Sequence, residues 1–177
     1  MRTNNQGAVI ELAPMPTAQF EKWKPGNIAD YARQHTIGGK WTAKDSLRLA
    51  REEFDQLLPQ GIATPGHTFF SITRSSDRKA VGILWIKVER EPMPVSFIYL
   101  IEIFQPFRRR GFATQAMKLL EKEMRRSGLE SIRLHVFGHN PAARSLYEKL
   151  GYVTTNVLMR KRLPRPHQPS ATTRPST

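Results

Sequence analysis

The sequence predicts an α/β sandwich with a mixed sheet that is mostly antiparallel in its first part and parallel around the loop Arg108–Gly111. Three apolar stretches in the middle of the chain are joined by short connections, which favours antiparallel neighbours. An amphipathic helix then separates two strand-like stretches, and such a crossover joins parallel strands. At 177 residues the chain is long enough for one domain with a sizeable core. We therefore expect a single domain with the element order βααβββαβαβ.

The N-terminal part of the chain reads as one strand followed by helices. Residues 8–15 are expected to form a strand, because an apolar run there is ended by two prolines. Thr17 can cap a helix, which we expect to break at Pro25-Gly26. A second helical piece is predicted over residues 27–34.

Three strands follow a further helix that begins at Thr42, where Asp45 supplies a partial capping box. The strands are predicted from apolar runs bounded by turn residues, and they cover residues 68–73, 80–88 and 95–104. The last run is too long and too continuous for a solvent-facing edge. We therefore place it centrally in the sheet.

The C-terminal half alternates helices and strands. Helical spacing of apolar residues begins near Gly111 and ends at Ser127-Gly128. Residues 131–136 alternate apolar and polar, which predicts a strand parallel to the preceding one. Asn140-Pro141 opens a last helix with a capping residue and a proline at the first helical position. Residues 152–161 are predicted to form a final strand.

The net charge of +13 is uneven along the chain. Five basic residues and no acid lie between Arg160 and the C-terminus, so the rest of the chain carries +8. The excess on the body suits an anionic ligand, whereas the tail could touch nucleic acid or acidic surfaces without specificity. We expect a flexible leader over residues 1–7, the domain over 8–163 and a disordered basic tail, rich in Pro, Ser and Thr, over 164–177.

Two classes of chemistry and location are not supported by the composition. The chain has no cysteine, which excludes disulfides, thiolate catalysis and cysteine-ligated zinc, and no metal site is predicted. Residues 1–8 are polar, and nowhere do 18 apolar residues run together. Secretion and membrane spanning therefore find no support, and we expect a cytoplasmic protein.

The loop before the Gly111 helix has the features of a phosphate site. A helix N-terminus leaves backbone N–H groups without intrahelical partners and carries the positive end of the helix dipole. Gly111 lets a bulky group approach the backbone, and Ala113 is small enough not to block it. Arg108, Arg109 and Arg110 add full charges, although a short arginine run can also be a solvated surface feature. The pattern favours phosphate binding, but it is neither a P-loop nor G-x-G-x-x-G.

Two motifs on these elements resemble those of a known enzyme family. Arg108-x-x-Gly111-x-Ala113 fits the [QR]-x-x-G-x-[GA] loop, and Asn140 to Tyr152, NPAARSLYEKLGY, fits N-x-x-A-x-x-L-Y-x-x-x-G-[FY]. Both belong to the Gcn5-related N-acetyltransferases (GNAT), which move an acetyl group from acetyl-CoA to a primary amine. The resemblance covers roughly residues 9–163. It implies a GNAT-like sandwich with helices on both faces of the sheet and a splay between two parallel strands.

The resemblance also implies where the cosubstrate acetyl-CoA binds. Backbone N–H groups at the end of the strand would bond the pantetheine arm at the splay, and the loop backbone would hold the pyrophosphate. Arg109, which stands where the family often has glycine, and Arg110 are candidates for the 3′-phosphate. Asn140 would contact the cofactor, although helix capping explains it equally well. The implied cofactor-binding residues are Ile103, Phe104, Gln105, Arg108, Arg109, Arg110, Gly111, Phe112, Ala113, Thr114, Asn140 and Tyr147.

Tyr147 and Glu102 are the candidate catalytic residues. In the family the tyrosine that matches Tyr147 points at the cofactor sulfur, and a phenol can protonate a departing thiolate. The alternative is a core aromatic with its hydroxyl at the rim. Glu102 is the only acid in the strand 95–104 and could take a proton from the amine, alone or with His135 of the next strand. Strand alternation predicts that Glu102 and Tyr99 lie on opposite faces.

Three functional hypotheses follow. The leading one is an acetyl-CoA-dependent N-acetyltransferase in which the amine attacks directly in a ternary complex. The second is a CoA-binding module that has lost catalysis and acts in regulation or interaction. The third is binding to nucleic acid through charge, but the sequence lacks the aromatic-basic interleaving of known readers, so specific binding is not expected.

The acceptor amine is not readable from the sequence. In the family its pocket is built from the first helices and the loops before the cofactor strand, here residues 23–41 and 64–67. A small molecule or a peptide fits this reading, and aminoglycoside, amino acid, polyamine and protein N-terminus all stay open. The oligomeric state, a homodimer included, also stays open.

Overall fold

The computed structural model describes residues 9–161 and 163. The predicted leader over residues 1–7 and the tail over 164–177 lie outside the described residues. The elements, in chain order, are β1 (Ile10–Pro14), α1 (Thr17–Ile37), α2 (Ser46–Leu57), the 3-10 helix η1 (Gly61–Ala63), β2 (His67–Arg74), β3 (Lys79–Glu89), β4 (Val95–Ile103), the 3-10 helix η2 (Gln105–Phe107), α3 (Phe112–Arg126), β5 (Ser131–Leu134) and α4 (Pro141–Lys149).

The strands form one mixed sheet in the order β1-β2-β3-β4-β5. The first four pair antiparallel with their sequence neighbours, and β5 pairs parallel with β4. The predicted fold class is therefore confirmed. β4 lies between an antiparallel and a parallel neighbour, and its far end leads into the Arg108–Gly111 loop.

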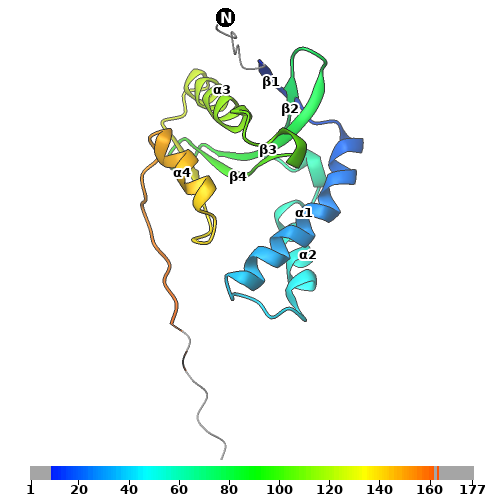
Figure 1. Cartoon of the computed structure of the whole chain (residues 1–177), viewed down its shortest axis with the longest axis vertical. Coiled ribbons are helices and arrows are strands. Elements are labelled where there is room, and N and C mark those ends of the chain that lie inside the picture. Colours follow the sequence, from blue (N-terminus) through cyan, green and yellow to red (C-terminus); the bar gives the residue numbers. More distant parts are fainter. Residues whose placement is uncertain (1–8, 162, 164–177) are drawn as a thin grey trace, which may run out of the picture.

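Helices cover both faces of the sheet, and each face has its own apolar core. On one face α3 and α4 pack against the strands, with Phe112, Met117 and Leu120 of α3 almost fully buried. On the other face α1 and α2 bury Phe20 and Phe54. Figure 1 shows α3 on one side of the strands and the α1–α2 pair on the other. The two sides of β4 therefore meet different sets of helices.

The predicted break at Pro25-Gly26 is wrong, since α1 runs through both residues as one helix. Proline inside a helix removes one backbone hydrogen bond and crowds the preceding turn. Phe20 before it is fully buried and Ile28 after it is 7% exposed. Packing of both flanking turns against the sheet therefore outweighs the local preference for a break.

A β-bulge lies in the middle of β4. Trp85 of β3 pairs with Leu100, but the next residue of β3, Ile86, pairs with Ile98, so Tyr99 has no residue opposite it. An extra residue shifts the alternation of the side chains that follow it. The bulge also marks the end of the parallel ladder, whose last pair is Ile98 with Leu134. Beyond it, β4 continues to Ile103 without β5 beside it, and β5 is shorter than predicted.

Beyond the bulge, β3 and β4 approach each other closely at Gly82. A Cβ atom at this glycine would lie 2.2 Å from the carbonyl oxygen of Glu102. Real Cβ atoms do not tolerate such a distance from backbone atoms. The sheet can close here only because residue 82 has no side chain.

The predicted final strand over residues 152–161 is wrong. This stretch is extended but pairs with no strand in the part of the chain that the structure describes. Its apolar side chains are largely exposed, from 74% for Val157 to 96% for Leu158. Figure 1 shows the segment, in orange, running from α4 away from the sheet. Strand propensity alone does not make a strand, because the backbone needs a neighbour to complete its hydrogen bonds.

Candidate active site

The loop after β4 is fixed to the end of that strand. The 3-10 helix η2 turns the chain, and the Arg108 side chain donates from Nε to the carbonyl oxygen of Ile103 over 2.8 Å. This bond spans five residues and closes the turn. Arg108 therefore has a structural role that the sequence did not suggest.

Two residues of the loop have left-handed backbone conformations, Arg109 with φ 63° and Gly111 with φ 79°. Arg109 stands where glycine is common in the family, and the positive φ costs a side-chain-bearing residue on the order of 1 kcal/mol. The loop keeps the glycine-like path all the same. At Gly111 a Cβ would meet nothing within 4 Å, so the surface above the backbone is open.

The first turn of α3 presents free backbone donors beside this open surface. No side chain caps the helix, and its first internal bond runs from the N–H of Gln115 to the carbonyl of Gly111. The N–H groups of Phe112, Ala113 and Thr114 thus precede the first intrahelical bond. The Phe112 ring is 3% exposed and anchors the turn in the core. These donors fit a pyrophosphate group at a helix N-terminus.

The arginines of the loop are exposed. Within residues 9–161 and 163, none of Arg108, Arg109 and Arg110 forms an ion pair with a carboxylate. Their charges therefore stay available to an anion.

One of the predicted cofactor-binding N–H groups at the end of β4 is already bonded within the sheet, and the contact of Phe104 with the cofactor stays a prediction. The N–H of Phe104 donates to the carbonyl oxygen of Val81 on β3 over 2.9 Å, so it is not free for a pantetheine arm. In an antiparallel pair, successive residues point their backbone groups to alternate edges. The N–H of Ile103 therefore points to the opposite edge, where β5 has ended. Its contact with the cofactor stays a prediction, as does that of Gln105 at the start of η2.

Asn140 caps α4. Its side-chain oxygen accepts a hydrogen bond from the N–H of Ala143 over 3.1 Å. Such a cap stabilises a helix by about 1 kcal/mol, which accounts for the residue without a ligand. Its contact with the cofactor stays a prediction.

Tyr147 lies in the α3–α4 core with 8% of its surface exposed, and its ring packs on Tyr152 with centroids 5.7 Å apart. Burial raises the pKa of its phenol above 10, so the hydroxyl keeps its proton at neutral pH. The hydroxyl of Tyr152 is buried, and burial together with the nearby Glu121 carboxylate raises the pKa of its phenol. Of these two tyrosines, Tyr147 is the buried residue of α4, whereas Tyr152 follows the end of that helix.

Glu102 lies on the other face of β4, towards α1. Its Oε2 atom accepts a hydrogen bond of 3.4 Å from the indole N–H of Trp23. Glu102 is partly exposed, so its carboxylate contacts both solvent and the Trp23 ring.

Tyr99 lies on this same face, contrary to the prediction from strand alternation. Its ring stacks on Trp85 with centroids 4.7 Å apart, and Trp85 packs edge-on against Trp23 at 6.3 Å. The bulge at Tyr99 is the cause, because it restarts the alternation one residue later. No local pattern in the sequence marks it.

His67 packs beside Trp85 and Tyr99 on this face. Its Nδ1 atom accepts a hydrogen bond of 2.9 Å from the Trp85 indole, and its ring lies 5.4 Å from that of Tyr99. The four side chains of Trp23, His67, Trp85 and Tyr99 are called the aromatic wall below. Burial and nearby Lys87 lower the pKa of His67, which agrees with an unprotonated Nδ1. Trp23 and His67 belong to the predicted acceptor region, whereas the sequence predicts Trp85 only as part of the strand over residues 80–88.

His135 does not pair with Glu102. Its ring lies edge-on to Phe137, 5.2 Å away, and Phe137 in turn contacts His35 at the end of α1. In the same region the Tyr31 hydroxyl donates to Glu53 over 2.7 Å, and Lys40 reaches the other carboxylate oxygen. The hydrogen bonds from Lys40 and Tyr31 lower the pKa of Glu53 although burial opposes them. This cluster closes the end of the α1–α2 pair.

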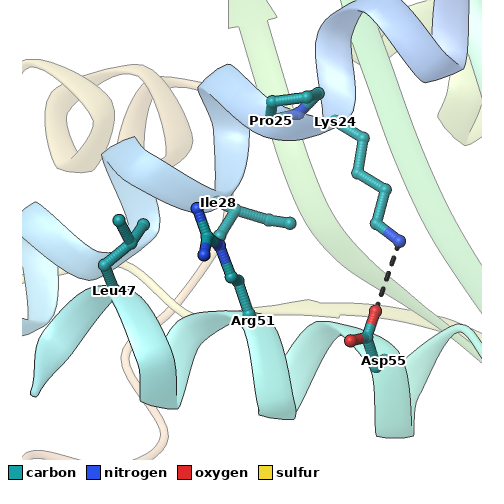
Figure 2. Close-up of a pocket in the computed structure, with 6 residues that line it drawn as sticks. All are labelled: Lys24, Pro25, Ile28, Leu47, Arg51 and Asp55. Atoms are coloured by element: carbon teal, nitrogen blue, oxygen red, sulfur yellow. Dashed lines mark hydrogen bonds and ion pairs between the residues drawn. The ribbon is translucent and has the colours of Figure 1, made fainter.

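A groove of about 360 Å³ lies between α1 and α2 (Figure 2). An ion pair of 3.3 Å joins Lys24 and Asp55 across it, and Ile28 and Leu47 form its apolar part. Its lining includes neither Glu102 nor the loop. It is therefore separate from the site described above.

Two further properties concern the described residues alone. Their histidine and acidic side chains form no group of three or more that could hold a metal ion. None of their helices combines the length and the apolar character that crossing a membrane requires.

Fold and loop together define a class of α/β proteins in which parallel strands part beside a helix N-terminus suited to phosphates. A model of the Acetyltransferase (GNAT) family matches residues 29–152. The chain therefore belongs to the GNAT family of N-acetyltransferases, and the predicted resemblance is confirmed.

Two curated relatives come from Bacillus subtilis (strain 168), and both are named uncharacterized N-acetyltransferases. YycN is 37% identical over 155 residues, which cover 87% of this chain and 99% of YycN. YdgE is 33% identical over 153 residues, which cover 86% of this chain and 97% of YdgE.

Solved structures show the same fold. The crystal structure of YycN matches with a TM-score of 0.84 over 89% of this chain and all of YycN. AAC(6')-Iy, in complex with the bisubstrate analogue CoA-S-monomethyl-acetylneamine, matches with a TM-score of 0.55 at 18% identity, over 89% of this chain and 99% of that one. At that identity the likeness concerns the fold alone.

Proposed function

We propose that this protein transfers an acetyl group from acetyl-CoA to a primary amine by direct attack in a ternary complex. One observation carries the proposal. The candidate proton acceptor, Glu102, faces α1 on one side of the sheet, the candidate proton donor, Tyr147, belongs to the core on the other side, and β4 runs on past the last residue of β5 that pairs with it. A thioester lying beside this part of β4 would meet an amine from one face and lose its thiol towards the other.

The loop and α3 would hold the cosubstrate. The free N–H groups of the first turn and the open surface above Gly111 fit the pyrophosphate, and the exposed arginines supply charge for the remaining phosphate. The outward N–H of Ile103 would align the pantetheine arm. Bound in this way, acetyl-CoA supplies an activated acyl group, and the protein's part is to position it and exclude competing geometries.

Glu102 would receive the proton that the amine must lose. An amine is a nucleophile only when its nitrogen lone pair is free, and a carboxylate in reach, directly or through water, can take the proton. The Trp23 indole fixes one carboxylate oxygen, which leaves the other free for this role. The amine nitrogen then bonds to the acyl carbon as the carbon–sulfur bond breaks.

Tyr147 would return a proton to the departing sulfur. Its phenol is protonated at neutral pH because burial raises its pKa. A thiolate with an ordinary pKa near 8.5 is a weaker base than phenolate, and burial weakens the acidity of Tyr147 further. The transfer therefore relies on proximity of the hydroxyl to the sulfur as the carbon–sulfur bond breaks, rather than on intrinsic acidity. The protein needs no nucleophile of its own, in keeping with a chain without cysteine.

The aromatic wall of Trp23, His67, Trp85 and Tyr99 would line the acceptor side. Small-molecule and peptide amines are both candidates for the acceptor. AAC(6')-Iy binds an analogue that joins CoA to an acetylated neamine, but it shares only the fold with this chain. Cytoplasmic location and a homodimer also stay predictions.

The test is a panel of amines, monitored by thiol release from acetyl-CoA together with product detection by mass spectrometry. CoA binding is measured in parallel by calorimetry. We expect binding and release with at least one amine class. Tight CoA binding without release over a panel of aminoglycosides, amino acids, polyamines and peptides would instead favour a CoA-binding module without catalysis.

A further inference from the structure

The aromatic wall continues into a larger group of rings on the α1–α2 face of the sheet. Phe54 of α2 packs against Trp85 with ring centroids 5.6 Å apart and against Tyr31 of α1 at 5.9 Å. Tyr31 in turn lies edge-on to His35, with centroids 4.3 Å apart. The wall that holds the Glu102 carboxylate is therefore part of an extended aromatic surface.

Tyr99 is the most exposed ring of the wall. Its accessible fraction is 36%, whereas Trp85 beside it is 3% exposed. The two rings are close to parallel, with an interplanar angle of 20°, so Trp85 covers one face of Tyr99. Tyr99 stands at the bulge of β4, three residues before Glu102. Its accessible part thus presents a flat surface near the candidate base, and such a surface favours another ring or a cation over its face.

Two carboxylates near these rings already have a cation beside them. Lys40 forms an ion pair of 2.9 Å with Glu53, the residue that accepts the Tyr31 hydroxyl. Lys87 forms an ion pair of 2.8 Å with Glu89 on β3. Neither carboxylate can hold an ammonium group of a substrate without giving up its lysine.

The two histidines of this surface add no charge at neutral pH. Burial and nearby Lys87 lower the pKa of His67, although Glu89 opposes them. Burial and nearby Lys40 lower the pKa of His35 in the same way. Both imidazoles therefore act as neutral rings rather than as ionic partners of a substrate.

Glu102 is the exception among the carboxylates. Within residues 9–161 and 163 it forms no ion pair, and its hydrogen bond comes from the neutral Trp23 indole. Its charge can balance one ammonium group. A second ammonium group placed on the rings would lose water without gaining a carboxylate, which is costly. The chain's net charge of +13 also repels a polycation.

We propose that the acceptor of the acetyl transfer set out above, on which this inference rests, is a small primary amine with one positive charge on an aromatic or similarly flat body. Its ammonium group meets Glu102, which takes the proton that the amine loses, and its ring lies on Tyr99. Polyamines and aminoglycosides carry several ammonium groups and do not match this arrangement of charge.

The first test compares kcat/KM, followed by thiol release, for amines that differ in the body. The panel is phenethylamine, cyclohexylethylamine, butylamine, spermidine and an aminoglycoside. We expect phenethylamine to exceed butylamine by about tenfold or more. Cyclohexylethylamine, which lacks the flat ring, should lie between them, and the two polycations should fall below butylamine. A polycation acetylated as efficiently as phenethylamine would overturn the inference and leave the acetyl transfer intact.

The second test locates the preference, measured as the ratio of kcat/KM for phenethylamine to that for butylamine. Tyr99→Leu removes the flat ring and should bring the ratio close to unity, whereas Tyr99→Phe keeps the ring and should retain it. Phe70→Leu is the matched control on the opposite face of the sheet, where Phe70 packs against the α3–α4 core, and it should also retain the ratio. An unaltered ratio in Tyr99→Leu would contradict the assignment, since a general loss of folded protein affects both substrates equally.

Calorimetry with the CoA-loaded protein separates this inference from the proposed function, because CoA has no acetyl group to transfer. If no amine of the panel is acetylated, the proposed function fails. Tighter binding of phenethylamine than of spermidine, lost in Tyr99→Leu, would then still support recognition of a flat monocation by this surface. No binding of phenethylamine, or binding no tighter than that of spermidine, would overturn it.

Discussion

The indole of Trp23 on α1 donates a hydrogen bond to the carboxylate of Glu102 on β4, joining residues 79 positions apart in the sequence. The contact fixes the side of the sheet on which the Glu102 carboxylate lies. It also leaves one carboxylate oxygen free, which a proton acceptor needs.

Glu102→Gln should lower kcat/KM by about 10²-fold or more, because the amide still accepts the Trp23 bond but does not take up a proton. The measurement is the pH dependence of kcat/KM with a responsive amine. In the variant the acid limb that reports the carboxylate should disappear. Trp23→Phe is the control that removes the hydrogen bond and keeps the acid, and it should retain the limb. An unchanged profile in Glu102→Gln would remove the base assignment.

Tyr147→Phe should reduce kcat by about 10² to 10⁴-fold while the CoA dissociation constant changes little, because only the hydroxyl is lost. Turnover is followed by thiol release and binding by calorimetry. Tyr152→Phe is the matched control, since that ring packs on Tyr147 and its own hydroxyl lies near Glu121 rather than in the proposed acid role. It should leave turnover intact, and equal losses in both variants would speak against an acid role for Tyr147.

Gly111→Ala should weaken CoA binding, because the new methyl group would stand on the open surface where phosphate is expected. Gly128→Ala is a close control, since both glycines have positive φ, 79° and 75°, and neither Cβ would meet an atom within 4 Å. Each substitution should cost about 1–2 kcal/mol of stability from backbone strain. The two variants are compared by thermal unfolding and CoA calorimetry. The same CoA affinity in both would contradict the site.

Gly82→Ala should destabilise the fold by about 3 kcal/mol, because its Cβ would clash with a backbone oxygen that no rotamer change can move. Gly26→Ala, in α1 with nothing within 4 Å, should instead stabilise by about 0.5–1 kcal/mol. Urea unfolding measures both. If Gly82→Ala had the same free energy of unfolding as the natural protein, the close approach of β3 and β4 at this position would not contribute to stability.

Stability should fall between pH 7 and pH 5 through His67 and His35. Burial lowers the pKa of both imidazoles below the ordinary value near 6.5. The unfolded chain then binds more protons than the folded one, so the contribution is full above pH 6.5 and is lost as pH falls towards the folded pKa values. His67→Asn keeps an acceptor for the Trp85 indole and should flatten the free energy of unfolding against pH. The same slope in the variant would exclude His67 as its source.

The sequence predicted the parts of the fold that rest on local pattern. The strand pairing and the Gly111 loop follow from apolar periodicity and turn residues, and they agree with the structure. Three features depend on contacts that no local pattern contains. Burial on both flanks carries α1 through Pro25, the bulge at Tyr99 reverses the expected faces, and residues 152–161 have no neighbouring strand.

The candidate site divides in the same way. The loop backbone could be named from a motif, because helix N-termini always expose donors. The bond of the Phe104 N–H to Val81 could not be predicted from the sequence, since it depends on the register of β3 and β4 beyond the bulge. The sequence places Trp23 and His67 in the acceptor region. The contact of Trp85 with them depends on the three-dimensional fold and could not be predicted from the sequence.

The three tryptophans of the chain all belong to the core beneath α1 and α2, as Trp23, Trp41 and Trp85, while the Gly111 loop leads into the helix of the opposite face. Their emission is therefore an optical signal from one side of the sheet. In the proposed site an amine beside Glu102 would change the surroundings of Trp23, whereas phosphates at the α3 N-terminus would lie on the face opposite the indoles. The protein thus carries, without a label, an optical signal on the face of the sheet where the amine is expected, and this signal is remote from the expected phosphate site.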